Sequence, residues 1–343
     1  MSKILLETLR GNPSEQVPFW FMRQAGRYLP EYREVRATTK SFMDFCYSPD
    51  KAAEVTLQPL RRYGMDGAIL FADILVVPDG LGQNVWFEAG LGPQLTPVKT
   101  KTDVDQLLLA GFHDKVGAVY QTVAKLKNML PPETTLLGFA GAPWTVATYM
   151  IQGAGSKDHA AARQMGYGDP VLFGRIIDLL VEATSQYLCK QIEAGADAVQ
   201  IFDSWAAALP ESVFDDWVIK PTKAIVDKVR AKHPDTPIIG FPRLAGLQYA
   251  RFIAETGVDA VSLDTGIPMG WAASTLQNNV CVQGNIDPHL VVSGGQPMVD
   301  EAIRILEALK NGPHVFNLGH GFVPETPPEN VALLSDTIRN YRR

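Results

Sequence analysis

The stretch GADAVQIFD, residues 195–203, joins the end of a helical pattern to a short apolar run. Two other stretches resemble it, GMDGAILFAD at residues 64–73 and GVDAVSLD at residues 257–264. In each, a glycine suits the left-handed position that ends a helix, an apolar run of strand length follows, and an aspartate stands at or near its far end. The pattern predicts an αβ unit used three times, with three carboxylates on one side of a sheet.

Five further apolar runs raise the number of candidate strands to eight. They lie at residues 19–22, 136–139, 238–241, 281–283 and 315–318, and helical patterns separate most of them, as at residues 171–193, 213–232 and 298–310. Alternating strands and helices indicate a parallel sheet, and eight strands favour closure into a (β/α)8 TIM barrel of about 250 residues.

The 343-residue chain is longer than such a barrel needs, and the excess fits loop insertions at residues 78–102 and 152–169. No linker or change of composition divides the sequence, so we expect one domain over residues 1–343. A doubly wound open sheet is the alternative. It is disfavoured because no G-x-G-x-x-G turn follows any of the apolar runs.

The composition is that of an ordinary globular protein, with 46% hydrophobic residues, 20% charged residues and a formal net charge of −6. The negative charge argues against nucleic acid and anionic membranes as partners. No run approaches the ~20 apolar residues of a membrane span, and residues 1–10 lack the apolar core of a signal peptide. The three widely spaced cysteines, without C-x-x-C, fit a reducing compartment. We expect a cytoplasmic protein.

Two arginines, Arg23 and Arg27, follow the first apolar run, where a barrel strand would reach the surface. A guanidinium group is a permanent planar cation that pairs with carboxylates and phosphates. The alternative is a structural role in which both arginines pair with neighbouring acids. An acidic chain that binds an anion needs a local cluster of cations, and these two residues predict such a cluster.

Other polar side chains follow the remaining strands, where catalytic groups of a (β/α)8 barrel project. Asp73 stands among apolar residues, and a carboxylate there is costly to ionise unless it is paired or hydrogen-bonded. It is therefore either an acceptor for ligand donors or part of a buried salt bridge or helix cap. The other strand-end candidates are Tyr149, Phe202, Asp203, Ser204, Arg243, Asp264, Asn285, Asp287 and His320.

Metal and phosphate-loop chemistry have little support in the sequence. His320 stands alone, with neither H-x-x-x-H nor Cys-x-His spacing, and the glycine-rich residues 153–157 lack the G-x-x-x-x-G-K-[ST] pattern. No set of residues forms a convincing nucleophilic triad. From the residues alone we predict a barrel enzyme, without a protein-bound metal, that acts on a small anionic molecule carrying several carboxylates.

Five motifs together resemble the uroporphyrinogen decarboxylase family. They are FMRQAGRYLPEY at residues 21–32, FADILVVP at 71–78, GFAGAPWT at 138–145, QGNIDP at 283–288 and FNLGHG at 316–321. The resemblance implies a (β/α)8 barrel, usually a homodimer, that works without metal or organic cofactor. It further implies conversion of the four acetate side chains of uroporphyrinogen III to methyl groups, giving coproporphyrinogen III and CO2 in haem biosynthesis.

The resemblance also implies roles for individual residues. Arg23 and Arg27 match family arginines that bind substrate carboxylates, and Asp73 matches the aspartate that accepts the pyrrole N–H groups. These three are the expected catalytic residues. The expected substrate-binding residues are Arg23, Arg27, Asp73, Tyr149, Phe202, Ser204 and His320.

The resemblance leaves alternatives open. The proton donor is Arg23, a bound water or a substrate carboxyl, because the pKa of a guanidinium exceeds ~12 in water. Related barrels include zinc methyltransferases with a His-x-Cys pair, but residues 241–246 read FPRLAG and contain neither ligand. In the same stretch, Pro242 and Arg243 replace an expected small residue and lysine. A tetrapyrrole carrier without catalysis would need the arginines but not Asp73.

Overall fold

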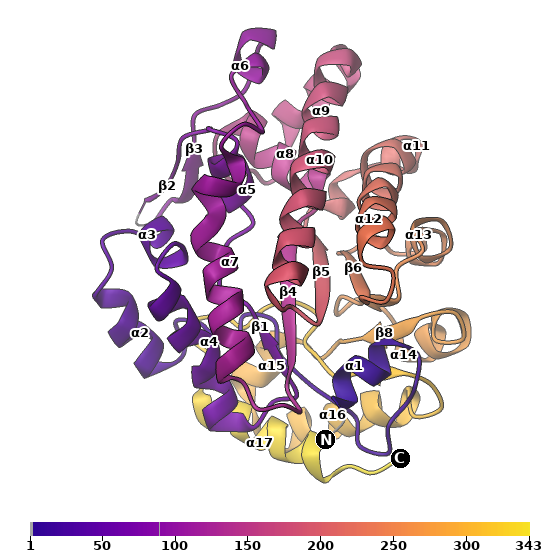
Figure 1. The fold of residues 1–343 in the computed structure, drawn as a ribbon. Helices are drawn as coiled ribbons and strands as arrows, with labels where there is room; N and C mark the ends of the chain where they lie inside the picture. Colours follow the sequence, from indigo (N-terminus) through magenta and orange to yellow (C-terminus); the bar gives the residue numbers. More distant parts are fainter. Residues whose placement is uncertain (1–2, 89) are drawn as a thin grey trace.

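The computed structural model describes residues 3–88 and 90–343. Over these residues, parallel strands form a curled seven-stranded sheet in the order β1-β4-β5-β6-β7-β8-β9, with helices around it (Figure 1). The strands are β1 (Gly67–Ile69), β4 (Thr135–Gly141), β5 (Ala198–Asp203), β6 (Ile238–Pro242), β7 (Ala260–Ser262), β8 (Cys281–Gln283) and β9 (His314–Val315). The predicted barrel fold is confirmed.

The first expected strand, residues 19–22, closes the barrel with a single bridge. Phe19 pairs in parallel with Phe316, directly after β9. On the other side, the N–H of Asp66, directly before β1, donates to the carbonyl of Phe19 at 3.0 Å. This segment therefore takes the eighth position between β9 and β1.

The extended run stops at Phe21 because a tight turn follows. The N–H of Gln24 donates to the carbonyl of Phe21 at 2.9 Å, and Gln24 Oε1 accepts from the N–H of Phe21 at 3.0 Å. Between them, Arg23 has a φ of 63°, in the left-handed region. The turn ends strand pairing and places Arg23 at the mouth of the barrel, the end at which the strands finish.

The Gly-x-Asp part of the three repeated stretches has one structural role, at the end of the barrel opposite the mouth. Asp66, Asp197 and Asp259 directly precede β1, β5 and β7. Each carboxylate accepts a hydrogen bond from a backbone N–H at the start of the adjacent strand. The bonds run from Phe19 to Asp66 (3.0 Å), from Leu136 to Asp197 (2.8 Å) and from Ile238 to Asp259 (2.8 Å). These carboxylates set the register between neighbouring strands, and each is also paired with a basic side chain.

Helices cover the outside of the sheet, and both chain termini lie at the lower end in Figure 1. The helices up to the middle of the chain are α1 (Ile4–Leu9), α2 (Pro30–Ala37), α3 (Phe42–Cys46), α4 (Pro49–Tyr63), α5 (Val76–Gly80), α6 (Lys101–Asp105), α7 (Phe112–Met129), α8 (Pro143–Gln152), α9 (Ala160–Gly168) and α10 (Pro170–Ala194). Those that follow are α11 (Glu211–Phe214), α12 (Lys220–Lys232), α13 (Gln248–Thr256), α14 (Met269–Trp271), α15 (Pro288–Ser293), α16 (Gly295–Ala308) and α17 (Pro328–Asn340).

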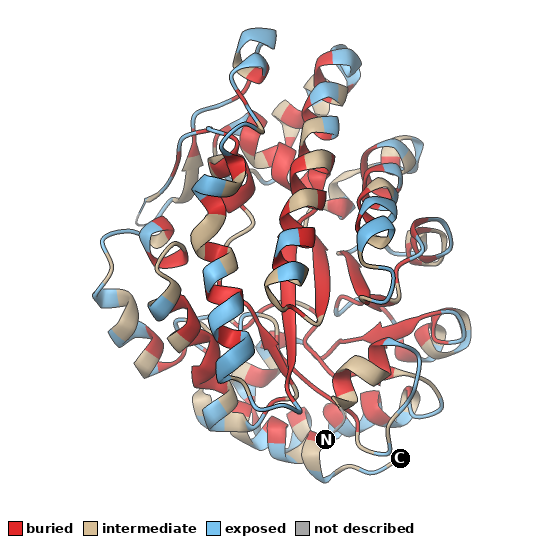
Figure 2. Cartoon of the chain, in the orientation of Figure 1, coloured by how far each residue is buried: buried red, intermediate tan, exposed pale blue. Residues whose placement is uncertain are grey.

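Three short segments of other helical types complete the elements, namely the 3-10 segment η1 (Ala206–Ala208) and the π-helical segments η2 (Asp215–Ile219) and η3 (Ala272–Leu276). The helical pattern at residues 171–193 forms α10, and the pattern at 213–232 spans α11, η2 and α12. Burial follows the predicted pattern, because the strands are buried while the helices bury one side and expose the other (Figure 2).

Both expected insertions contain regular structure. Residues 78–102 include an antiparallel hairpin of β2 (Val85–Glu88) and β3 (Gly92–Leu95), which the sequence pattern did not predict, and residues 152–169 include α9. The N–H of Leu95 donates to the carbonyl of Gly153 at 2.7 Å, which joins the two insertions. Gly153 has a φ of 82°, and a Cβ there would lie 2.6 Å from Pro97 Cγ. A glycine is needed at this close approach.

A chain of buried polar side chains crosses the interior of the barrel. Trp20 Nε1 donates to Gln283 Oε1 at 2.8 Å, and Gln283 Nε2 donates to Gln200 Oε1 at 3.1 Å. Because buried polar groups need partners, this chain links three separate strand positions. It occupies part of the barrel interior with side chains whose polar groups are paired.

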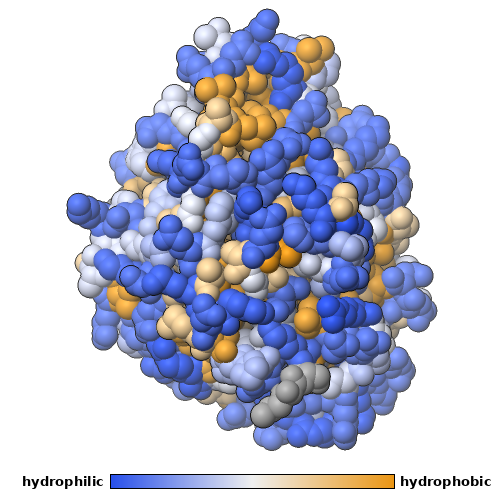
Figure 3. All heavy atoms as spheres, in the orientation of Figure 1, coloured by the Kyte–Doolittle hydropathy of each residue, from blue (hydrophilic) through white to orange (hydrophobic). Residues whose placement is uncertain are grey.

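The surface in the orientation of Figure 3 is mostly hydrophilic, with apolar atoms gathered near its upper end. Among the described residues, no helix combines the length and the apolar character that crossing a membrane requires.

Candidate active site

Four of the expected site residues line a recess at the mouth: Arg23, Asp73, Tyr149 and His320. Each keeps contact with solvent. Each is also crowded by protein, which lowers the pKa of Arg23 and His320 and raises the pKa of Asp73 and Tyr149 through loss of hydration. Side chains that water can reach and that protein nevertheless surrounds must lie on a concave surface.

These residues also act on one another electrostatically. After burial, the neighbouring Tyr149 and Asp73 oppose the lowering of the Arg23 pKa, whereas the cations Arg243 and Arg27 add to it. The charge of Arg23 in turn opposes the raised pKa of Asp73. The residues come from different loops at the ends of strands and, for Tyr149, from helix α8; they are far apart in the sequence, and the fold brings them together.

The arginines at the mouth form no ion pair with a carboxylate of the residues that the structure describes. Within residues 3–88 and 90–343, no carboxylate forms an ion pair with Arg23, Arg27 or Arg243. The structural alternative, in which Arg23 and Arg27 pair with neighbouring acids, is therefore wrong. The side chain of Arg23 packs directly against the backbone of Gly321, where a Cβ would lie 2.3 Å from Arg23 Cδ.

Asp73 has one oxygen bound and one oxygen available. Its Oδ1 accepts from the N–H of Leu75 at 2.8 Å, within the turn that leads into α5. In the part of the chain that the structure describes, Oδ2 accepts no hydrogen bond and the carboxylate forms no ion pair. Asp73 is thus not part of a buried salt bridge, and it can accept donors from a ligand in the recess.

Asp203, which ends the second repeated stretch, has a structural role. It is buried, its Oδ1 accepts from Thr145 Oγ1, and Thr145 Oγ1 accepts from the N–H of Trp205 at 3.1 Å. Burial raises the pKa of Asp203 to about 7, although the hydrogen bond from Thr145 lowers the pKa. These contacts hold the loop after β5 that carries Ser204.

Asp264, which ends the third repeated stretch, is also used inside the protein. Its Oδ2 accepts from the N–H of Leu244 at 2.8 Å and from the hydroxyl of Tyr249 at 2.9 Å, and its Oδ1 accepts from the N–H of Gly266 at 2.9 Å. It fixes the loops after β6 and β7. Asp203 Oδ2 also lacks a hydrogen-bond partner, but it is buried. Among the described residues, Asp73 is the one of the three strand-end aspartates with an unpartnered oxygen that a ligand can reach.

His320 is neutral at physiological pH. Burial, and then the charges of Arg23 and Arg243, lower its pKa to about 3. Its Nδ1 is buried without a hydrogen-bond partner among the described residues. A neutral imidazole beside two arginines can donate one hydrogen bond from one ring nitrogen and accept one at the other, but it has no extra proton to give.

Phe202 and Ser204 lie at the end of β5, beside this group. Phe202 is buried, with ring centroids 5.6 Å from Phe139 and 6.2 Å from Phe241. Ser204 is partly exposed. Over residues 3–88 and 90–343, no hydrogen bond joins the Ser204 hydroxyl to the mouth arginines, and the place of both residues in the site stays a prediction.

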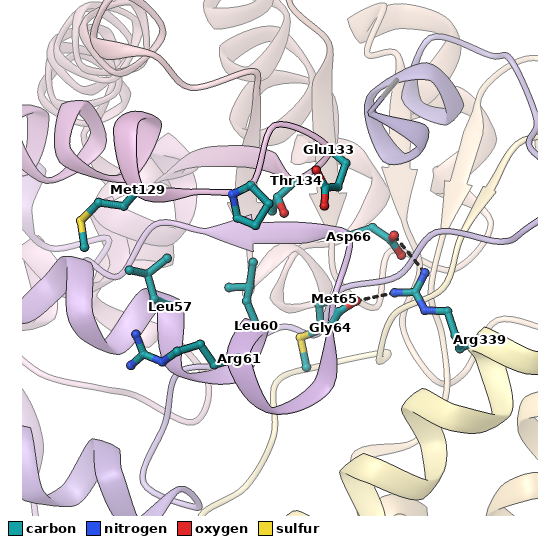
Figure 4. Close-up of a pocket in the computed structure, with 11 residues that line it drawn as sticks. Leu57, Leu60, Arg61, Gly64, Met65, Asp66, Met129, Glu133, Thr134 and Arg339 are labelled. Atoms are coloured by element: carbon teal, nitrogen blue, oxygen red, sulfur yellow. Dashed lines mark hydrogen bonds and ion pairs between the residues drawn. The ribbon is translucent and has the colours of Figure 1, made fainter. Parts of the chain in front are cut away.

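The described residues bring no three His, Cys, Asp or Glu side chains together in a metal-binding arrangement. A cavity of about 510 Å3 does exist at the opposite end of the barrel, near the ends of α4, α7 and α17 (Figure 4). It holds the ion pair of Arg339 with Asp66, at 3.1 Å, and apolar side chains such as Leu57 and Met129. None of the predicted site residues lines it.

Residues 2–341 match the family model described as uroporphyrinogen decarboxylase (URO-D). The chain is 53% identical over 337 residues to a protein of Sphingopyxis alaskensis named uroporphyrinogen decarboxylase, with 98% of each chain covered. It is 52% identical to the protein of the same name from Paracoccus denitrificans, covering 98% of this chain and 99% of the relative. This chain belongs to the uroporphyrinogen decarboxylase family.

Among solved structures, a methyltransferase from Methanosarcina mazei aligns with a TM-score of 0.80 at 19% identity, covering 97% of this chain and 96% of the other. At that identity the likeness shows the fold alone. Uroporphyrinogen decarboxylase motifs supply most of the mouth, since residues 21–32 carry both arginines, 71–78 carry Asp73 and 316–321 carry His320.

The sequence reasoning missed two supporting residues. Thr145, which donates to Asp203, lies inside the family motif at residues 138–145, and nothing in the motif distinguishes its hydroxyl from the other residues there. Tyr249, which binds Asp264, lies on the buried side of α13. Its spacing is that of a core residue, and nothing in the sequence marks its hydroxyl as an anchor for a mouth loop.

Proposed function

We infer that the protein is a uroporphyrinogen decarboxylase, a carboxy-lyase of porphyrin biosynthesis. In each of four turnovers an acetate side chain loses CO2 and gains one proton at the remaining carbon, so that CH2–COO⁻ becomes CH3. The observation that carries this inference is the recess itself. Among the described residues, it combines arginines that form no ion pair with a carboxylate and an aspartate whose unpartnered oxygen a ligand can reach, in a chain that belongs to the family throughout.

We assign the substrate carboxylates to Arg23 and Arg27, because planar guanidinium groups bind carboxylates with two parallel hydrogen bonds. We assign the converging pyrrole N–H groups to Asp73, whose Oδ2 is free to accept them. Tyr149 and His320 border the same recess, and Phe202 and Ser204 complete the proposed contacts at the end of β5.

The chemistry needs an electron sink. Protonation of a pyrrole carbon makes the ring cationic, and the electrons of the breaking C–C bond then flow into that cation as CO2 leaves. The methylene group that results takes up a second proton to become CH3, and the ring carbon then loses the first proton, so that one proton is gained for each CO2 released. A negatively charged Asp73 beneath the N–H groups would stabilise the positive charge, and a preorganised carboxylate does so without reorganisation. We therefore propose a reaction that uses neither a metal nor an organic cofactor.

The pKa values bear on the proton donor. His320, with a pKa of about 3, carries no spare proton at neutral pH. Burial lowers the pKa of Arg23, which makes its guanidinium a stronger acid than in water. We propose Arg23 as the donor, and a bound water and a substrate carboxyl are the rival donors. If Arg23→Lys keeps near-native turnover at saturating substrate, the guanidinium is not the donor.

The deciding test is incubation with uroporphyrinogen III, followed by separation of the products by their number of carboxylates. Successive loss of four carboxyl groups is the expected result. Tight binding without any product would instead identify a tetrapyrrole carrier. Asp73→Asn keeps the size of the side chain and removes its charge, so we expect turnover to fall by about 100-fold or more. Unchanged turnover would contradict the role of Asp73.

A methyltransferase activity is not proposed. The solved relative shares the fold at 19% identity, whereas relatives of about half identity are named uroporphyrinogen decarboxylase. Residues 241–246 also lack the His-x-Cys pair. Activity that survives dialysis against a chelator would agree with the proposed metal-free mechanism, and loss restored by zinc would contradict it.

We further propose that residues 1–343 act as one domain and that two copies form a homodimer in the cytoplasm. Apolar side chains exposed at the mouth end, Leu108, Val171, Leu244 and Leu247, support a dimer contact there. The three cysteines are free and buried, which agrees with a reducing compartment. Neither nucleic acid nor a membrane is a proposed partner. Light scattering after size-exclusion chromatography tests the dimer, and a monomer at micromolar concentration would contradict it.

A further inference from the structure

Arg243 directly follows β6 and stands across the mouth of the barrel from Arg23. Phe19 lies between β9 and β1, so β6 is the fourth strand from Phe19 in either direction around the sheet. Arg23 and Arg27 therefore approach the recess from one side, and Arg243 approaches it from the opposite side.

The backbone at Arg243 is held by neighbouring strand ends. Its N–H donates to the carbonyl of Asp203 on β5 at 3.0 Å. The next residue, Leu244, has a φ of 60°, which is unfavourable for leucine, and its N–H is bound by Asp264 at 2.8 Å. A strained turn that the surrounding structure enforces is typical of functional sites. It determines the direction in which Arg243 enters the mouth.

Among the described residues, the guanidinium of Arg243 has a cationic neighbour, Arg23, and no ion-paired carboxylate. It lies close enough to Arg23 and His320 that, after burial, its charge contributes to the lowered pKa of both. Its Nε is buried without a hydrogen-bond partner, and the described residues offer it no ion-pairing carboxylate. Buried donors without partners are rare in folded proteins, and clustered like charges repel. An anion from outside the chain would satisfy both conditions.

We propose that Arg243 binds a carboxylate on the edge of the substrate opposite the edge held by Arg23 and Arg27. The ligand class that fits is a ring-shaped polycarboxylate with anionic groups on opposing edges. This inference rests on the proposed function and adds a specificity-determining contact to it. Arg243 makes its contact on binding, at the periphery of the ring, and takes no part in bond breaking.

The experiment compares Arg243→Met and Arg243→Lys with the wild type, and uses Arg304→Met as the matched control. Arg304 pairs with Glu301 on the outer helix α16, so its replacement removes the same charge away from the mouth. Kinetics with uroporphyrinogen III give kcat and KM separately. Quenching of tryptophan fluorescence by uroporphyrin, the unreactive oxidised octacarboxylate, gives a dissociation constant that does not depend on turnover.

We expect Arg243→Met to raise KM and the uroporphyrin dissociation constant by about 10- to 100-fold, the value of a hydrogen bond to a charged group, with kcat nearly unchanged. The KM and dissociation constant of Arg243→Lys should lie between those of the wild type and of Arg243→Met, because lysine keeps the charge without the planar guanidinium. If the methionine variant does not fold, the lysine variant tests the contribution of the guanidinium geometry by itself. Arg304→Met should match the wild type.

Two results would overturn the role of Arg243: a methionine variant that binds uroporphyrin like the control, or a loss confined to kcat. Failure of the proposed function looks different. In that case the wild type binds uroporphyrin but releases no decarboxylated product, and the comparison of dissociation constants still decides whether Arg243 holds a carboxylate.

Discussion

Replacement of Asp203 by asparagine should change the free energy of unfolding in a way that depends on pH. Compared with the wild type, the variant should gain stability as the pH rises from acidic to alkaline values. Burial raises the pKa of this carboxyl from 3.8 to about 7, and the side chain is only 2% exposed. The folded-state pKa is the higher one, so the contribution of Asp203 to stability is fully present below 3.8 and is lost as the pH rises through 7.

The size of the effect follows from the shift. One pKa unit corresponds to about 1.4 kcal/mol, so the rise of about three units costs the ionised folded state about 4 kcal/mol. Asparagine cannot ionise and can still accept from Thr145 Oγ1. Any cost that does not depend on pH, such as an unpaired amide N–H, cancels when the variant and the wild type are compared at two pH values.

The assay is urea unfolding of both proteins at about pH 4 and about pH 8. We expect the stability difference between variant and wild type to move by about 4 kcal/mol in favour of the variant. Asp264→Asn is the control, because Asp264 accepts three hydrogen bonds and its replacement should destabilise the protein at both pH values. A difference for Asp203→Asn that is equal at both pH values would refute the reasoning.

Three further predictions concern the mouth and the thiols. Gly321→Ala puts a Cβ 2.3 Å from Arg23 Cδ, and we expect it to lower kcat/KM by about 100-fold because it displaces the guanidinium. Gly155→Ala is the control, since a Cβ there meets open space and should leave kcat/KM unchanged. Equal effects of the two substitutions on kcat/KM would contradict the prediction. The ring protons of His320 should show no NMR titration between about pH 5 and pH 8, because its pKa is lowered to about 3, and a midpoint near 6.5 would exclude that environment. The three buried cysteines, whose thiol pKa values burial raises, should react with a disulfide reagent only after unfolding.

Much of the fold could be predicted because its signals are local. Apolar runs, helical spacing and the glycine after each helix depend on neighbouring residues, and they correctly placed seven strands and the helices α10, α12 and α16. The hairpin of β2 and β3 was missed, since its strands are short and its sequence is rich in glycine and proline. The run at residues 19–22 was predicted as a strand but forms one bridge, because Gln24 binds Phe21 and turns the chain.

The candidate site was predicted less evenly. Arg23, Asp73, Tyr149 and His320 lie together at the mouth, and all but Tyr149 belong to motifs long enough to identify from sequence; their roles stay predictions. The sequence marks Arg243 as a strand-end candidate and as a departure from the family pattern, but it does not show which residues Arg243 faces. Its position opposite Arg23 depends on the order of strands around the closed barrel, which no local pattern contains.

By itself, the sequence determined the repeated αβ unit, and with it the three aspartates at the strand ends. Only the tertiary structure decided which of them is free for a ligand. Thr145 comes to Asp203 from 58 residues away and Tyr249 comes to Asp264 from 15 residues away, whereas Asp73 is bound on one oxygen by its own turn alone. The chemical availability of a carboxylate depends on donors that folding brings to it, and three similar stretches therefore acquire different roles.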